Sequence, residues 1–225
     1  MHIEPGIVDG TKIVLSYATA AAAVGYATKL AADTIRAQGA TSFATRTVVT
    51  TALVFCFFEV LPHYSVGVSE VHFIFGSTLF LLFGAAPAAF GLALGLLLQG
   101  LFFVPTDLPQ YGMNVTTILV PLFAIGALAD RVIARDTPYV DLKYRQALSL
   151  STAYQAGIVA WVAFWAIYGR GPGADNLSSI ATFAGSYMLV ITVEPLVDLG
   201  VLALAKSMRG VFGGGFVTPR LHQPA

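Results

Sequence analysis

Apolar stretches of roughly helical length, separated by short polar segments, set the hydropathy pattern of the chain. A helix needs about 20 predominantly apolar residues to cross a bilayer. Seven stretches come near this length: residues 13–32, 47–61, 72–83, 85–104, 115–132, 148–168 and 180–205. Only Gly84 and the nearby Pro87 divide the third stretch from the fourth, which indicates a tight hairpin. The pattern predicts an all-α polytopic membrane protein with seven transmembrane helices.

The composition supports this class and excludes others. Of the 225 residues, 56% are hydrophobic and 11% are charged, whereas about 25% are charged in an average soluble domain. The formal net charge is +0, so the chain has no basic domain with which to bind nucleic acid. The single cysteine, Cys56, excludes a disulfide framework and a thiolate zinc site. These numbers exclude a soluble enzyme, a disordered chain and a nucleic-acid-binding protein.

The distribution of Lys and Arg predicts the orientation in the membrane, because cytoplasmic loops carry an excess of both. Seven spans with an external N-terminus place ten basic residues inside and two outside. The inner ones are Lys29, Arg36, Arg46, Arg131, Arg135, Lys143, Arg145, Lys206, Arg209 and Arg220, and the outer ones are Lys12 and Arg170. We therefore expect the N-terminus outside and the C-terminus inside.

The two ends of the chain differ in character. Residues 1–11 contain Glu4 and Asp9 but no Lys or Arg, unlike the basic start of a secretory signal peptide. We therefore expect the first span to be retained and the mature chain to begin at or near Met1. Residues 1–205 are predicted to form a single transmembrane domain. Residues 206–225, with a glycine-rich run at 210–216, are predicted to form a flexible cytoplasmic tail.

Few residues offer chemistry inside the apolar stretches. The sequence contains no GxxxxGK[ST] and no HExxH motif, so we expect neither ATP hydrolysis nor zincin chemistry. The ionisable residues near or within spans are Glu59, Glu70, His72, Glu194 and Asp198. Glu194 and Asp198 lie one helical turn apart and are equally compatible with a structural and a functional pair. Glu59 and His63 have i, i+4 spacing, which fits a helix-end histidine or, less well, an intramembrane metallohydrolase.

The N-terminus, Met1-His2-Ile3-Glu4-Pro5-Gly6, predicts a metal chelate. A bulky second residue prevents removal of Met1, so its amine, the amide nitrogen of His2 and the His2 ring form consecutive nitrogen donors. Planar nitrogen sites suit Ni(II) and Cu(II). His63 and His72 are the candidates for a fourth nitrogen, since His222 is predicted to lie inside. We favour His72, which begins a span of only about 20 Å within a hydrocarbon core of about 30 Å. The alternative, an exposed terminal histidine and a capped helix start, stays open at this point.

Five groups of residues carry a resemblance to a known family. They are Met1-His2-Ile3 with Gly6, Ser69-Glu70-Val71-His72, Gln99, Gly112-Met113-Asn114 and Glu194-Pro195-Leu196. In these the chain resembles the membrane-embedded metal-capturing subunit, or M component, of energy-coupling-factor cobalt and nickel importers. The carboxylate of Glu70, beside the expected ligand His72, departs from the family pattern.

The resemblance implies a function that is not enzymatic. It implies a seven-helix bundle whose N-terminus inserts into its centre and holds Co(II) or Ni(II), the transported substrate. The ligands would be the Met1 amine, the amide and ring nitrogens of His2, and His72, with Ser69, Glu70 and Asn114 around them. The implied partners are a transmembrane coupling subunit and cytoplasmic ATPase subunits, with a small accessory membrane subunit as an optional addition. The implied location is the plasma membrane of a bacterium or archaeon. The alternatives are a permease for a small organic substrate such as a vitamin, the metallohydrolase above, and a scaffold that binds no metal.

Overall fold

The computed structural model describes residues 2–208 and 215–224. Met1 and the run 210–214 of the predicted tail lie outside the described residues. Eight α-helices, five short 3-10 helices (η) and two strands follow one another along the described chain. In order they are η1 Gly10–Ile13, α1 Val14–Gln38, α2 Ala40–Glu59, β1 Tyr64–Val66, β2 Ser69–Val71, α3 Gly76–Phe83, α4 Ala85–Phe102, η2 Pro105–Gln110, α5 Tyr111–Val132, η3 Tyr139–Asp141, α6 Tyr144–Arg170, α7 Ala174–Met188, η4 Leu189–Thr192, α8 Glu194–Ser207 and η5 Pro219–Leu221.

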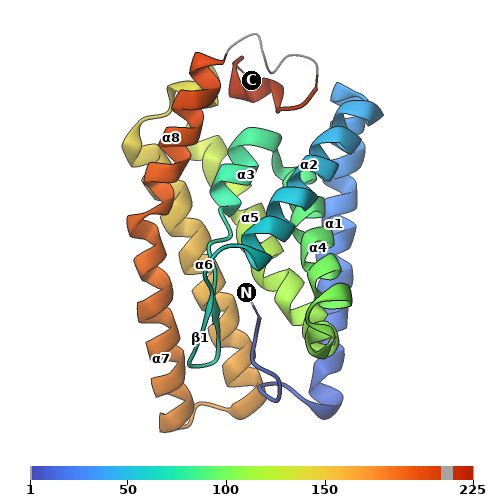
Figure 1. Cartoon of the computed structure of the whole chain (residues 1–225), viewed down its shortest axis with the longest axis vertical. Coiled ribbons are helices and arrows are strands. Elements are labelled where there is room, and N and C mark those ends of the chain that lie inside the picture. The colour runs from blue at the N-terminus through green and yellow to red at the C-terminus, as the bar shows by residue number, and fades with distance from the viewer. Residues whose placement is uncertain (1, 209–214, 225) are drawn as a thin grey trace.

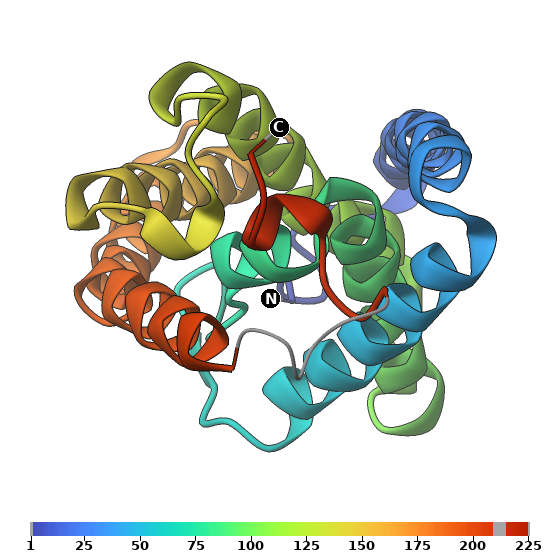
Figure 2. The ribbon, with the colours of Figure 1, turned by 90° about the horizontal axis from the view of Figure 1, so that it is seen from above.

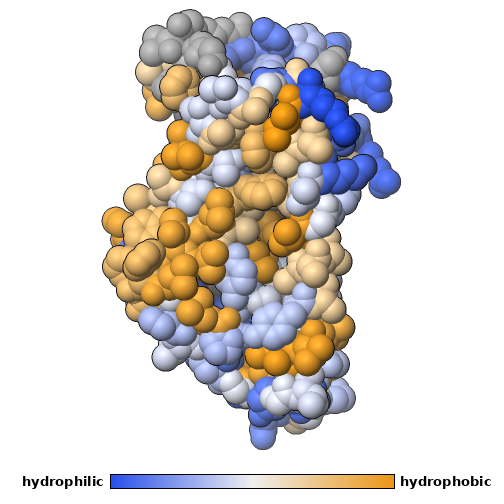
Figure 3. All heavy atoms as spheres, turned by 90° about the vertical axis from the view of Figure 1, so that its right-hand side faces the viewer, coloured by the Kyte–Doolittle hydropathy of each residue, from blue (hydrophilic) through white to orange (hydrophobic). Residues whose placement is uncertain are grey.

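The architecture is that of a multi-pass membrane protein. Six helical segments of the described chain are long and apolar enough to cross a bilayer. They are Gly10–Gln38, Ala40–Glu59, Ala85–Phe102, Pro105–Val132, Tyr144–Arg170 and Ala174–Ser207. On the face formed by α1 and its neighbours, apolar side chains occupy a broad middle zone and hydrophilic ones gather at the upper end (Figure 3). The helices therefore present an apolar belt of the kind that a bilayer covers.

The third predicted span differs from the prediction. His72 does not begin a helix. It follows the antiparallel hairpin of β1 and β2, in which Ser65 pairs with Glu70, and the helix α3 starts only at Gly76. With eight residues, α3 is about 12 Å long, which is too short to span the membrane alone. An apolar run has the same composition whether it is extended or helical, so its hydropathy could not separate the two.

Two other boundaries bear on the site. Gly84, with a φ of 86°, ends α3 and precedes α4, so the predicted tight hairpin is present. The last predicted span is not one continuous helix, because α7 ends at Met188 and α8 begins at Glu194 after the 3-10 turn η4. Pro195 in the first turn of α8 lacks the N–H that a continuous helix would require there.

The bundle packs through small residues where its helices approach most closely. A Cβ atom added to Gly91 would lie 2.4 Å from the Thr50 Cβ, and one added to Gly95 would lie 2.6 Å from the Val54 Cγ1. The glycines of α4 thus form the surface against which α2 rests. The largest fully buried side chain in the interior is that of Trp165 on α6.

The two ends of the described chain lie in different parts of the bundle. The N-terminal segment runs from the lower end into the centre, whereas η5 lies across the upper end, above α3 (Figures 1 and 2). The Thr218 amide donates to the Leu82 carbonyl at 2.8 Å, and the Leu221 side chain is fully buried. The described part of the tail therefore has defined contacts with the bundle, while the domain boundary near residue 205 stays a prediction.

Candidate metal site

The N-terminal segment enters the bundle as an added strand beside the hairpin. Ile3 forms an antiparallel bridge with Ser69. The Glu70 amide donates to the His2 carbonyl at 3.0 Å, and the Glu4 amide donates to the Val68 carbonyl at 3.2 Å. The Ser69 hydroxyl donates to the same His2 carbonyl at 2.8 Å. This pairing fixes His2 beside the strand that leads to His72.

Three further residues, from α4, η2 and α5, contact His2 or Ile3. His2 is 4% exposed, and its Nε2 lies 2.8 Å from the Gln99 Oε1 near the end of α4. Its Nδ1 lies 2.5 Å from the Asp107 Oδ2 on η2. The Ile3 amide donates to the Asn114 Oδ1 on α5 at 2.9 Å. Both faces of the N-terminal segment are thus bonded to the bundle.

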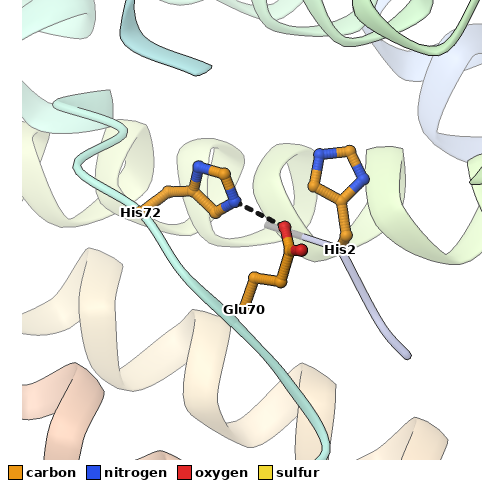
Figure 4. Close-up of side chains that lie close together, drawn as sticks. All are labelled: His2, Glu70 and His72. Carbon is orange, nitrogen blue, oxygen red and sulfur yellow. Dashed lines mark hydrogen bonds and ion pairs between the residues drawn. The ribbon is translucent and has the colours of Figure 1, made fainter. Parts of the chain in front are cut away.

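His2, Glu70 and His72 come together as a potential metal-binding group. One ligand atom from each of the three residues lies within 4.8 Å of the others, and Figure 4 shows the two rings on either side of the carboxylate. The His72 Nε2 lies 2.8 Å from the Glu70 Oε2, and the His2 and His72 ring centroids are 5.4 Å apart. The structure therefore brings together His2 and His72 from sequence positions 70 residues apart. The roles of these residues, like that of Met1, stay predictions.

The other candidate histidine, His63, has a different position. Its exposed ring stacks on the His72 ring, with centroids 4.8 Å apart and an angle of 7° between the planes. The group of three potential ligands does not include His63. His63 therefore covers His72 from the outside, and Glu59, its supposed partner, lies at the end of α2.

Aromatic rings enclose His72 on two sides. Its side chain is 1% exposed. The Phe58 ring lies edge-on to it with centroids 5.1 Å apart, and the His63 ring stacks on it. The carboxylate of Glu70 reaches its Nε2. His72 therefore lies in a buried pocket that leaves Glu70 and His2 as its polar neighbours among the residues of the metal-binding group.

The sequence pattern alone did not find Asp107. This residue lies in the short polar connection between α4 and α5, in the run Val104-Pro105-Thr106-Asp107, which is typical of an exposed turn. Its carboxylate lies against the His2 ring because η2 folds back over the end of α4. No spacing rule relates residues 2 and 107, so no sequence signal could have paired them. Ser69 and Asn114, in contrast, were predicted near the site and do contact the N-terminal segment.

Glu194 and Asp198 are not part of this group. Both are buried within the bundle, and both accept hydrogen bonds from the start of α3. Of the intramembrane carboxylates considered from the sequence, only Glu70 belongs to the metal-binding group.

The fold is that of a multi-pass membrane protein, and two buried histidines and a half-buried carboxylate, donor types that bind first-row divalent ions, come together in its interior. Comparison with known proteins gives the family. The sequence model of the cobalt uptake substrate-specific transmembrane region matches residues 2–211, and the chain belongs to this family. It is accordingly a membrane transport component for cobalt or a related transition metal, and not an enzyme.

Two solved structures share the fold. One is described as a transition metal transporter, with a TM-score of 0.59, 18% identity, and coverage of 94% of this chain and 93% of that chain. The other is described as a truncated transition metal transporter, with a TM-score of 0.55, 18% identity, and coverage of 93% of this chain and 98% of that chain. A comparison with curated proteins found no match.

Proposed function

We propose that this protein is the substrate-specific membrane subunit of an energy-coupling-factor importer, and that it captures one Co(II) or Ni(II) ion from the outside and passes it inward. The observation that carries the proposal is the pairing of residues 2–4 with residues 68–70, which places His2 beside His72 in the bundle. The family match to cobalt uptake proteins supports the same substrate class.

The proposed ligands are the Met1 amine, the amide and ring nitrogens of His2, and the His72 ring. Support comes from the hydrogen bonds that hold the chain next to these donors, since the Ile3 and Glu4 amides are both occupied by protein acceptors. Glu70 has a position from which it either ligates the ion directly or holds the His72 ring. Metal-ligating histidines are commonly oriented by such a carboxylate.

We further propose seven membrane crossings, with the N-terminus outside and the C-terminus inside. The hairpin of β1 and β2, the extended residues 72–75 and α3 together make the third crossing, which α3 alone is too short to complete. Support comes from the split of ten inner to two outer basic residues. The partners in this proposal are a transmembrane coupling subunit and cytoplasmic ATPases, and optionally a small accessory subunit, in a bacterial or archaeal plasma membrane.

Elemental analysis of the purified chain after exposure to equimolar Co(II) and Ni(II) tests the proposal. We expect about one bound ion per chain, and the ratio of the two metals gives the preference. A variant with one Ser added before Met1 should lose the ion, because a new peptide bond removes the amine and displaces the chain end by about 3.8 Å. The matched control carries the same Ser after Ala225.

The outcomes separate the alternatives. An organic-substrate permease or a metal-free scaffold predicts no stoichiometric metal in the unmodified chain. Equal metal content in the two extended variants would show that the amine is not a ligand.

A further inference from the structure

A buried polar network ties the start of α8 to the segment that carries His72. Glu194 is fully buried. Its Oε1 accepts a hydrogen bond from the Phe75 backbone N–H at 3.1 Å. Its Oε2 accepts hydrogen bonds from the Ser151 hydroxyl at 3.1 Å and from the side-chain Nε2 of Gln155. Two donors on α6 therefore orient the carboxylate, and its other oxygen is directed at the backbone that leads into α3.

A second carboxylate secures the same turn of α3. Asp198, one helical turn further along α8, is 1% exposed. It accepts the Ser77 hydroxyl at 2.9 Å and the Thr78 hydroxyl. Carboxylates at the N-terminus of a helix are stabilised by its unpaired N–H groups and its dipole. In the described part of the chain, neither carboxylate forms an ion pair with Lys, Arg or His, so their partners are the donors of α3 and α6.

The residue that Glu194 holds has an unusual backbone conformation. Phe75 has a φ of 53°, the only positive φ of a non-glycine residue among those described. The left-handed region is unfavourable for a bulky side chain because its Cβ comes too close to the following carbonyl oxygen, so surrounding contacts must maintain it. Such outliers point to functional constraint. Phe75 lies three residues after His72 and turns the extended chain into α3.

The geometry assigns a positioning role to Glu194: by holding Phe75 and the first turn of α3, with Asp198 as a second anchor, it fixes His72 relative to His2 at the metal site. This assignment rests on the proposed function, since it concerns the same ion. Ser69 and Asn114 hold the His2 side of the site, and Glu194 holds the His72 side. Glu194 touches no proposed ligand, so it acts through the backbone of residues 73–75.

The test compares Co(II) affinity and the visible absorption spectrum of bound Co(II) in full-length variants. Glu194→Leu removes the acceptor. We expect the Co(II) affinity to fall about 10–100-fold, the usual effect of losing a contact that supports a metal ligand, and the spectrum of bound Co(II) to change. Glu194→Gln keeps an acceptor oxygen for the Phe75 N–H and should restore most of the affinity and the original spectrum. Asp198→Leu should have a smaller effect, because Asp198 holds α3 and not Phe75.

Thr50→Val is the matched control for loss of a buried polar contact. The Thr50 hydroxyl is buried between α2 and α4, where the Arg46 and Pro87 carbonyls are its acceptors, away from the start of α3. This variant should lower the melting temperature but leave the Co(II) affinity and spectrum unchanged. A purely structural role for Glu194 predicts the same result for Glu194→Leu, and that result would overturn the assignment.

Two further outcomes are distinguishable. If Glu194→Leu gives no folded protein, Gln155→Met decides, because it removes a donor that orients Glu194 while leaving α3 intact. We expect weaker binding and an altered spectrum, and an unchanged affinity and spectrum would refute the assignment. If the unmodified protein binds no Co(II) or Ni(II), the proposed function fails, whereas normal binding in every Glu194 variant refutes only the positioning role.

Discussion

Replacing Asn114 with leucine should weaken metal binding without removing a proposed ligand. The Asn114 Oδ1 accepts the amide N–H of Ile3, the residue directly after His2. Ile3 is 1% exposed, so water cannot replace the lost acceptor. Leucine has a similar volume and leaves the packing of α5 nearly unchanged, so the main effect should be an unpaired N–H in the docked N-terminal segment.

The magnitude follows from the burial of that N–H. A buried donor left without an acceptor costs about 1–3 kcal/mol, and about 1.36 kcal/mol corresponds to a factor of ten. The ratio of docked to undocked N-terminal segments should therefore fall by a factor of about 5–150. If only the docked segment binds metal, the apparent Kd rises as the docked fraction falls. The full factor is thus an upper limit for the rise in apparent Kd. It is reached only if undocked states are already substantially populated in the unmodified protein.

Competition titration of Co(II) against a chelator measures this change. Asn114→Asp keeps an acceptor oxygen and should bind more tightly than Asn114→Leu. The control is Asn176→Leu, because Asn176 is also buried and donates to the Ala166 and Gly171 carbonyls at 3.0 and 2.7 Å, outside the metal site. If Asn114→Leu and Asn176→Leu bind Co(II) equally well, docking of Ile3 does not control the metal site, and the reasoning fails.

The other predictions concern His72, Glu70 and the membrane orientation. Elemental analysis should show that His72→Ala abolishes bound metal while His63→Ala retains most of it, and the reverse pattern would contradict the site. Glu70→Gln should cause a partial loss of bound metal if Glu70 only supports His72, and a full loss if Glu70 ligates the ion. Pro172 and Asp136 are both exposed, so a cysteine at either position should be reachable by a thiol reagent. In a background without the native cysteine, a membrane-impermeant reagent should label Pro172→Cys from outside and Asp136→Cys only from inside. The opposite labelling would show that the topology is inverted.

The sequence predicted the long helices because their signal is local. Hydropathy over about 20 residues is enough to identify helices such as α4 and α5, and Gly84 marked the turn before α4. The region of residues 64–83 was not predictable in the same way. Its fold depends on pairing between two three-residue strands, β1 and β2. It also depends on the hydrogen bonds that Phe75 and Ser77 donate to Glu194 and Asp198, which lie more than 100 residues further along the chain.

The same distinction between local signals and long-range contacts applies to the candidate site. His2 could be proposed from donor spacing at the N-terminus. His72 was favoured because it was expected to begin a short span, and this reason was wrong, since α3 starts only at Gly76. The resemblance pointed to His72, Ser69, Gln99 and Asn114. The contacts of Asp107 and Gln99 with the His2 ring required the folded bundle, because they depend on how η2 and α4 pack. The strand pairing of Ile3 with Ser69 was equally invisible, since a three-residue strand has no periodicity to detect.

The contacts of the N-terminal segment bear on how the cargo would leave the site. Four hydrogen bonds join residues 2–4 to Val68, Ser69, Glu70 and Asn114, and at about 0.5–1.5 kcal/mol each they contribute about 2–6 kcal/mol to docking. Burial of the Ile3 and Ile7 side chains adds to this. The segment is therefore held by protein contacts in addition to any that a bound ion would make. For the same reason, inward release has to break contacts that the ion did not create. The printed sequence contains no nucleotide-binding motif, so in our proposal that energy comes from the coupling and ATPase subunits.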